Sequence, residues 1–215
     1  MWRKSRLKIN INDMNKLDII CILDMSGSMG NIIVKAREGF NQFLKEQKES
    51  GNKIKFSLMF FDTSFYMPYK NISIKNVKKV DEKTYYANGG TALYDALGTS
   101  IDDYIDHLGV TPKNKRADKT LFVILTDGEE NSSRVYHKNL IKLMVTNMRE
   151  EYNSEFIYLG ANQDSCFQAE SMGMDRSNAF NYDATDDGIT VAYSSISSAT
   201  AYYANNTVTT NLFQQ

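Results

Sequence analysis

The feature that most constrains the fold is a nearly continuous apolar run from Leu17 to Leu23, which stops at Asp24. The run is rich in branched side chains, and such a pattern is typical of a strand that is covered on both faces. After a Ser-Gly-Ser-Met-Gly turn, apolar residues recur at the three-and-four spacing of a helix lying on a sheet. These residues are Ile33, Ala36, Phe40, Phe43 and Leu44, and Gly51 ends the predicted helix.

The same succession of strand and helix is repeated along the chain. Further strands are predicted over residues 54–61, 65–74, 120–126, 155–159 and 177–182, and further helices over residues 91–108, 138–150, 165–172 and 189–203. Strands and helices that alternate in this way indicate a mostly parallel sheet with right-handed crossovers. We therefore predict an α/β fold in which helices flank both faces of a sheet of about six strands.

One strand, at residues 65–74, is expected to run antiparallel at an edge of the sheet. Only the short Asp62-Thr63-Ser64 connection separates it from the strand before it, and such a short connection is typical of a hairpin. Pro68 agrees with this placement, because proline cannot donate a hydrogen bond to a neighbouring strand and is tolerated mostly at edges.

Length and composition favour a single domain. The 215 residues are 42% hydrophobic, which is enough for a substantial core, and no linker rich in Pro, Gly or Ser divides them. We predict one domain over residues 16–204. Residues 1–15 form an N-terminal segment, whose basic stretch Trp2–Lys8 we expect to be a solvated tail. Residues 205–215 are polar and unpatterned, and we expect a frayed C-terminal tail.

The overall charge does not recommend a nucleic acid or an anionic membrane as a partner. The chain has 25 basic and 26 acidic residues, a formal net charge of −1. No apolar run approaches the roughly 18 residues that a membrane span needs, and no signal peptide or anchor is recognised. Cys21 and Cys166 lack the spacing of a disulfide framework, so we expect buried thiols and a cytoplasmic, reducing location.

Three polar stretches lie where a predicted strand ends or a predicted helix begins. They are Asp24-Met25-Ser26-Gly27-Ser28, Thr91 after Gly89-Gly90, and Thr126-Asp127-Gly128. Ligands of open α/β sheets bind outside the carboxyl ends of the strands, and alternate side chains of an extended turn can converge. Hydroxyl and carboxylate oxygens without His or Cys suit Mg²⁺ or Mn²⁺ better than zinc or copper. The sequence therefore predicts one divalent ion, with Asp24, Ser26, Ser28, Thr91 and Asp127 as its candidate ligands.

This combination of residues resembles the von Willebrand factor A (vWA) domain family and its metal-ion-dependent adhesion site (MIDAS). The family pattern is Asp-x-Ser-x-Ser, then a Thr in a later loop, then an Asp after another strand, and all five positions are present in that order. The neighbouring sequences Gly-Gly-Thr-Ala-Leu-Tyr-Asp-Ala at 89–96 and Leu-Thr-Asp-Gly-Glu-Glu-Asn at 125–131 are similar to bacterial and phage members. The resemblance covers residues 16–204 and implies a Rossmann-like vWA fold.

The resemblance also implies how the ion would be held. Ser26 and Ser28 would bind Mg²⁺ or Mn²⁺ directly, together with either Thr91 or Asp127. The remaining acid and Asp24 would act partly through water. Two carboxylates balance the charge of the ion, but neutral hydroxyls donate less electron density than carboxylates do. Octahedral coordination leaves at least one position, which a Glu or Asp of a partner protein could fill.

A metal-dependent, non-enzymatic protein-binding module is therefore the function that the resemblance implies. Its stand-alone bacterial and phage relatives often work beside ATPases, kinases or phosphatases, so we expect such a partner for a monomeric chain. One alternative is a structural or assembly protein that uses the ion only to hold its loops together. A metal-dependent phosphoester hydrolase is the other alternative.

Enzyme motifs are not found. A haloacid-dehalogenase-like phosphatase needs a second acid two residues after Asp24, where this chain has Ser26. Neither a phosphate-binding Gly-Lys-Ser/Thr loop nor a Gly-x-Ser-x-Gly nucleophile elbow occurs. We therefore assign no catalytic residue and interpret His107 and His137 as cap or surface residues.

Single residues of the predicted site also have simpler interpretations. Any one of the five, taken alone, would be typical of a helix cap, so the metal hypothesis depends on their combination. Among the nearby acids, Asp95 is interpreted as a helix-start residue that interacts with the helix dipole. The other acids, Asp62, Glu129 and Glu130, are interpreted as rim charges.

Tyrosines near the predicted site leave two interpretations open. Tyr85 and Tyr86 directly precede the Gly-Gly-Thr loop, so they could contact a partner protein beside the metal or pack in the core. Core packing is the expectation for Tyr202 and Tyr203.

Overall fold

A computed structural model of the chain describes residues 16–207 and 209–213. The prediction of a solvated segment at residues 1–15 lies outside the described residues. The core is a six-stranded sheet with the strand order β3-β2-β1-β4-β5-β6. Its strands are β1 (Lys16–Asp24), β2 (Lys53–Phe61), β3 (Phe65–Ser73), β4 (Lys119–Thr126), β5 (Ser154–Ala161) and β6 (Ala179–Tyr182).

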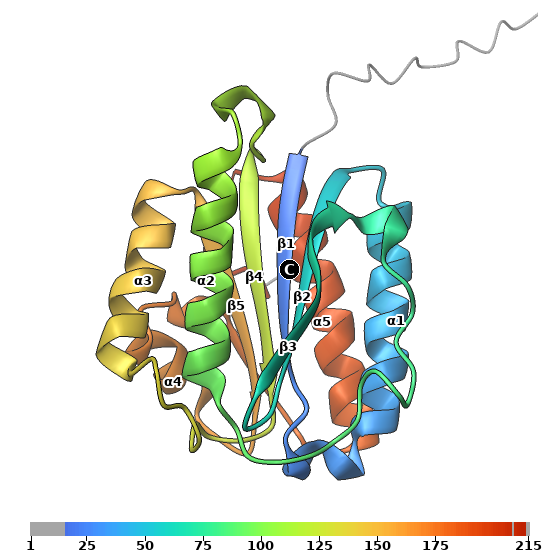
Figure 1. Cartoon of the computed structure of the whole chain (residues 1–215). Helices are drawn as coiled ribbons and strands as arrows, with labels where there is room; N and C mark the ends of the chain where they lie inside the picture. The colour runs from blue at the N-terminus through green and yellow to red at the C-terminus, as the bar shows by residue number, and fades with distance from the viewer. Residues whose placement is uncertain (1–15, 208, 214–215) are drawn as a thin grey trace, which may run out of the picture.

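Among the described residues, five α-helices flank the sheet, and Figure 1 shows helices on both of its faces. They are α1 (Ile33–Glu49), α2 (Leu93–Val110), α3 (Lys138–Glu151), α4 (Ser165–Ser171) and α5 (Asp186–Asn205). Helices α1 and α5 pack together on one face, and α2 and α3 lie on the other face. The predicted α/β fold, with its mostly parallel sheet between two layers of helices, is confirmed.

The central strand β1 shows why these residues form a buried strand. Successive side chains of a strand point to opposite faces, so an apolar residue at every position supplies both layers of the core. Leu17 and Ile19 belong to the cluster under α1 and α5. Ile20 and Ile22 belong to the cluster under α2 and α3. Strands β2 and β4 lie parallel to β1 on its two sides, which places the ends of these strands at common edges of the sheet.

Strand β3 is the antiparallel edge strand that the short connection predicted. It pairs only with β2, and two register shifts interrupt the pairing. Asn71 adopts a left-handed backbone conformation at φ 48°, and its backbone N–H donates to the Ser57 hydroxyl at 2.9 Å. The irregular pairing and Pro68 make this edge a poor template for another strand.

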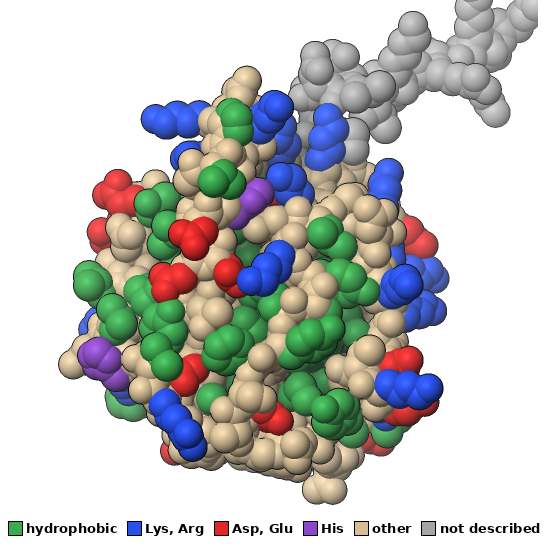
Figure 2. Space-filling view, in the orientation of Figure 1, with side chains coloured by type: hydrophobic (Ala, Val, Ile, Leu, Met, Phe, Trp, Pro, Cys, Tyr) green, Lys and Arg blue, Asp and Glu red, His purple; other side chains and the backbone are tan. Residues whose placement is uncertain are grey.

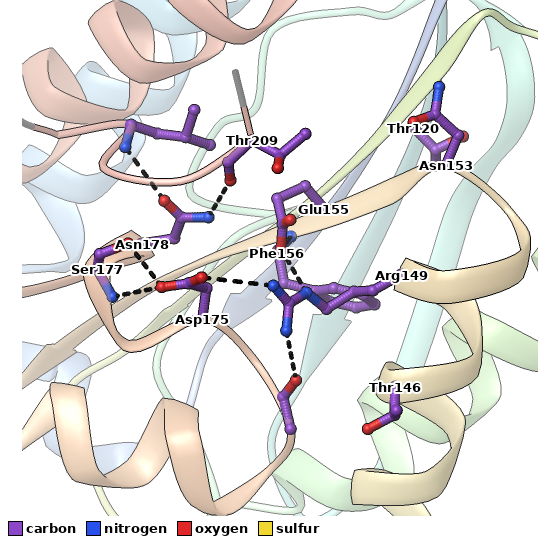
Figure 3. Close-up of polar contacts among 12 residues, drawn as sticks. Thr120, Thr146, Arg149, Asn153, Glu155, Phe156, Asp175, Ser177, Asn178 and Thr209 are labelled. Atoms are coloured by element: carbon purple, nitrogen blue, oxygen red, sulfur yellow. Dashed lines mark hydrogen bonds and ion pairs between the residues drawn. The ribbon is translucent and has the colours of Figure 1, made fainter. Parts of the chain in front are cut away.

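The end of the chain differs from the expected frayed tail. Leu212 is fully buried, and its backbone N–H donates to the side-chain oxygen of Asn178 at 3.1 Å. The side-chain amide of Asn178 donates to the carbonyl of Thr209 at 2.7 Å, as Figure 3 shows. Polar composition suggested a solvated tail, but Leu212 and Phe213 supply enough apolar surface for residues 209–213 to pack against the domain.

Charged side chains are distributed unevenly over the surface. In the view of Figure 2, Lys and Arg side chains gather around the end of the molecule at which β1 begins. This end is the amino edge of the parallel strands, opposite to the edge at which Asp24 lies. Among the described helices, none is long and apolar enough to cross a membrane.

Candidate metal centre

The three polar stretches meet at the carboxyl edge of the sheet. Asp24 ends β1 and Thr126 ends β4, and these two strands are parallel neighbours. The backbone N–H of Gly27 donates to the carbonyl of Gly89 at 3.0 Å, which joins the first loop to the loop before α2. In the third loop, the backbone N–H of Asn131 donates to the carbonyl of Thr91 at 3.0 Å. Backbone hydrogen bonds therefore hold the three loops together.

Hydroxyl and carboxylate oxygens approach one another closely at this edge. The hydroxyl oxygens of Ser26 and Ser28 are 3.0 Å apart. The Ser28 hydroxyl also donates to Oδ1 of Asp127 at 2.6 Å, although 99 residues separate these two positions in the sequence. Ser26 and Asp127 are buried, whereas Ser28 is exposed. The oxygen cluster therefore opens to solvent at Ser28.

Asp24 lies beneath this cluster and is fully buried. Its Oδ1 accepts the backbone N–H of Ser26 at 2.6 Å, and its Oδ2 accepts the Thr126 hydroxyl at 2.5 Å. Burial raises the pKa of Asp24 to about 6, although these hydrogen bonds favour the ionised form. The charge of Asp127 raises this pKa a little further. Asp24 therefore stabilises the turn at Ser26 through hydrogen bonds and contributes negative charge to the site.

Thr91 reaches the same cluster from the loop before α2. A Cβ atom placed on Gly128 would be 3.4 Å from the Thr91 hydroxyl oxygen and 3.6 Å from that of Ser28. The hydroxyls of Thr91 and Ser28 therefore lie on the same side of Gly128, close to each other. The side-chain oxygen of Asn131 accepts the backbone N–H of Thr91 at 2.9 Å and fixes its position. Thr91 precedes α2, which begins at Leu93, and does not open the helix as the sequence suggested.

The donor set fits a hard divalent cation. Burial raises the pKa of Asp127 as well as that of Asp24, and no ion pair in the described chain involves either carboxylate. A divalent cation beside them would favour their ionised forms. Within the described residues, no three His, Cys, Asp or Glu side chains form a group that could hold a metal. A metal here would therefore depend on the hydroxyls of Ser26, Ser28 and Thr91, which suit Mg²⁺ or Mn²⁺.

Three further residues support the cluster, and two of them, Tyr182 and Gln163, were not singled out in the sequence. The Tyr85 hydroxyl donates to the carbonyl of Asp24 at 2.9 Å, and the Tyr182 hydroxyl donates to that of Thr126 at 3.0 Å. Gln163 donates its side-chain amide to the carbonyl of Gly128 at 3.3 Å. Tyr85 is completely buried and packs on Phe60, with ring centroids 4.9 Å apart. Of the two interpretations of Tyr85, core packing is therefore the correct one.

Most of the nearby acids hold loops in place and are not free rim charges. Asp95 lies in the first turn of α2, as expected, but its carboxylate also accepts three backbone N–H groups of residues 134–136 at 2.8–2.9 Å. Glu130 accepts the backbone N–H groups of Ser132, Ser133 and Tyr94. Two further acids complete this set: Asp62 is buried and accepts from Ser64, whereas Glu129 is exposed.

The two histidines do not join the cluster. His107 lies in the last turn of α2, where its Nε2 is 3.3 Å from the Thr111 hydroxyl. His137 directly precedes α3. In the part of the chain that the structure describes, no hydrogen bond connects either imidazole to the candidate metal ligands, which agrees with the sequence-based interpretation.

Solved structures share this fold at low sequence identity. They include the pilus adhesin SpaC from Lactobacillus rhamnosus GG, with a TM-score of 0.63, 15% identity, and 86% of this chain covered. Proximal thread matrix protein 1 from the mussel byssus, solved with a zinc-occupied MIDAS motif, has a TM-score of 0.60 at 15% identity, with 87% covered. BatB from Bacteroides thetaiotaomicron has a TM-score of 0.53 at 14% identity, with 84% covered.

The chain spans only part of the longer proteins among these. It corresponds to 30% of the SpaC chain and 46% of the mussel protein, but to 97% of BatB. No curated protein sequence matches the chain. The family model of the von Willebrand factor type A domain matches residues 18–194. Domains of this type commonly mediate protein–protein interactions and bind a divalent metal at a MIDAS. The chain belongs to the von Willebrand factor type A domain family.

Proposed function

We propose that the chain is a protein-binding module that recognises an acidic residue of its partner through a bound Mg²⁺ or Mn²⁺. The observation that carries this proposal is the oxygen cluster at the carboxyl edge of the sheet. It combines two buried carboxylates that have no cationic partner in the described chain with the hydroxyls of Ser26, Ser28 and Thr91. Asp24, Ser26, Ser28, Thr91 and Asp127 would hold the ion in an intact MIDAS.

Neutral hydroxyls favour recognition of a carboxylate. An ion surrounded by many carboxylates has little attraction left for another anion, whereas hydroxyl ligands leave more of its charge uncompensated. Ser28 is exposed, so a partner can approach the cluster from solvent. A Glu or Asp of the partner would then complete the coordination. In this arrangement the residues of the chain hold the ion, and the ion holds the acidic side chain of the partner. We therefore propose binding and not catalysis.

Metal binding is tested first by calorimetric titration of Mg²⁺ and by electron paramagnetic resonance of Mn²⁺. We expect one saturable site in the wild-type protein and none in the Asp127→Asn variant. Glu129→Gln is the matched control, because Glu129 is exposed, lies two residues away and loses the same charge. Equal binding by the wild type and Asp127→Asn would show that the ion is not held where we propose.

The role of the ion in recognition needs a second test. Proteins retained from the native host in Mg²⁺ should be released by EDTA and should not bind the Asp127→Asn variant. If the partner remains bound in EDTA, the ion is structural and the module recognises its partner in another way. We propose an ATPase, kinase or phosphatase as the partner, on the resemblance to bacterial and phage members. The two free cysteines, Cys21 and Cys166, agree with a proposed cytoplasmic location.

A further inference from the structure

A second concave site lies at the opposite edge of the sheet from the candidate metal centre. This cavity, which we call the amino-edge cavity, has a volume of about 450 Å³. Five lysines line it, against Asp18 as the single carboxylate: Lys16, Lys53, Lys55, Lys75 and Lys115. The cavity has the size of many small-molecule sites, which span about 300–1,000 Å³.

Strand register places four of these charged side chains on one face of the sheet. Lys16 pairs with Lys53 across β1 and β2, and Asp18 pairs with Lys55 two residues further along. Because side chains alternate along each strand, these four point to the same side. Asp18 accepts a hydrogen bond from Tyr104 of α2 at 2.9 Å, so this side is the one that α2 covers. The register of β1 and β2 therefore places three lysines and one acid next to one another, whatever rotamers the lysines adopt.

Other cations at the same end of the molecule have structural partners. Arg116 donates to the carbonyl of Leu108 at 2.7 Å, near the end of α2, and Lys119 donates to that of Tyr203 at 2.6 Å, near the end of α5. Such contacts satisfy free carbonyls and the negative end of a helix dipole. These hydrogen bonds explain the positions of Arg116 and Lys119 without a bound ligand.

The lysines of the amino-edge cavity are different. Lys16 donates to the carbonyl of Asn114 at 3.1 Å. Within residues 16–207 and 209–213, the other four ammonium groups take part in no hydrogen bond or ion pair. Burial raises the pKa of Asp18, and the nearby charge of Lys55 offsets only part of that rise. Like charges gathered around one cavity repel one another, so this arrangement costs stability unless an anion is bound.

The apolar part of the lining narrows the class of anion. Ile54, Ile74 and Ala117 line the cavity together with the lysines, and Ile54 and Ile74 are largely buried in the cluster under α1 and α5. A compact ligand that combines several negative charges with an apolar or aromatic group would satisfy both parts. An acidic polypeptide spreads its carboxylates along an extended chain and fits a single cavity of this size less well. We propose that the amino-edge cavity binds a phosphorylated small molecule of the nucleotide class.

This site is separate from the candidate metal centre and does not depend on the proposed function. Lys16 and Asp24 are the two ends of β1, so the sites lie roughly 26 Å apart at about 3.3 Å per residue. Figure 1 shows the two edges at opposite ends of the sheet. Binding at the amino-edge cavity should therefore persist in EDTA.

The test is a titration of ATP in EDTA, followed by calorimetry and by amide chemical shifts. We expect saturable binding, with shifts concentrated at Lys53, Lys55 and Ser73. The Lys53→Gln plus Lys75→Gln variant should bind about tenfold more weakly, because each exposed charge pair contributes a factor of about three. Both lysines are exposed, and their removal relieves repulsion between like charges, so the thermal midpoint of this variant without ATP should equal or slightly exceed that of the wild type.

Four controls, one double variant and three other ligands, separate this proposal from general charge attraction. Lys78→Gln plus Lys79→Gln removes the same charge from exposed positions that do not line the cavity, and should leave ATP binding unchanged. Adenosine and inorganic triphosphate should each bind more weakly than ATP. The proposal is overturned if ATP does not bind, if both double variants weaken binding equally, or if triphosphate or a glutamate-rich peptide binds as tightly as ATP.

Discussion

Two of the regions in which this domain buries carboxylates differ in how the buried charge is stabilised. On the α3 side, Glu155 is buried at the start of β5, and the guanidinium of Arg149 donates to it at 2.9 Å. Arg149 also contacts Asp175 at 3.5 Å and donates to the carbonyl of Gly173 at 3.1 Å, as Figure 3 shows. At the carboxyl edge, Asp24 and Asp127 are equally buried, but no cation of the described chain pairs with them.

The difference separates a structural acid from an acid that is available to a ligand. Glu155 has a counter-charge within the chain, the guanidinium of Arg149. Asp24 and Asp127 have only hydroxyl and N–H donors, which do not remove the net charge of two carboxylates. A site that lacks its counter-charge is where a cation from solvent stabilises the fold most. This contrast is the physical basis for proposing a metal at the carboxyl edge.

The largest expected effect comes from removing the internal cation. Arg149→Ala leaves Glu155 buried without a counter-charge and should lower the free energy of unfolding by about 3 kcal/mol. Urea denaturation measures this difference. Arg176→Ala is the matched control, because Arg176 is 67% exposed and only 3.9 Å from Glu170, and it should change stability by less than about 0.5 kcal/mol. Equal effects of the two substitutions would show that Arg149 does not neutralise Glu155.

Adding the external cation should have the next largest effect. Mg²⁺ at a hundred times its dissociation constant should raise the free energy of unfolding by about 2.7 kcal/mol, because only the folded state presents the site. Thermal unfolding with and without EDTA checks this expectation. Asp127→Asn should abolish the increase, whereas Glu129→Gln should keep it. A stabilisation that survives in Asp127→Asn would place the ion elsewhere.

Removing the Thr126 hydroxyl, an uncharged donor beneath the cluster, should have a somewhat smaller effect on the free energy of unfolding. Thr126→Val keeps the shape of a buried side chain but removes the hydroxyl that donates to Asp24. The carboxylate then loses a donor that cannot be replaced by water, and we expect a loss of about 2 kcal/mol in unfolding free energy. Thr126→Ser retains the donor and should lose less. Equal losses for Val and Ser would mean that the methyl group, and not the hydrogen bond, stabilises this position.

The carboxyl edge could be predicted from the sequence because its signals are local. The apolar run before Asp24 predicts a buried strand, and the Thr-Asp-Gly stretch follows a second one, so the topology of a parallel sheet brings Asp24 and Asp127 to the same edge. The alternation of Asp24, Ser26 and Ser28 likewise required only a short turn. The structure places Ser28 and Asp127 in contact at 2.6 Å, so the side chains of these two loops converge, whereas their role as metal ligands stays a prediction.

The remaining features depend on contacts between distant segments. Glu155 is the second residue of β5, where an acid is usually solvated, and it is surrounded only because α3 and the residues around Asp175 pack against it. Asp95 accepts backbone groups about 40 residues away, and such loop conformations leave no periodic signal in a sequence. The packing of Leu212 was missed for a similar reason, because one apolar residue in a polar tail forms no pattern.

The smallest predicted effect is a pH dependence of stability caused by Glu155. It tests whether the charge of Arg149 fully offsets the cost of burying this carboxylate. Burial raises the pKa of Glu155 above its ordinary value, and the charge of Arg149 lowers it again without cancelling the rise. The folded state then binds this proton more tightly than the unfolded state, whose glutamate titrates near about 4.3. The contribution to stability is complete below that pH and is lost as the pH rises through the folded pKa.

Comparing urea denaturation of the wild type with Glu155→Gln, across this pH range, isolates the contribution. Glutamine resembles the protonated acid, so the wild type should lose stability relative to the variant as the pH rises. The opposite trend would mean that the attraction of Arg149 exceeds the cost of burial. The fold would then favour the ionised form of Glu155, whereas burial disfavours the ionised form of Asp24. The contrast between these two buried acids would be larger than the structure alone indicates.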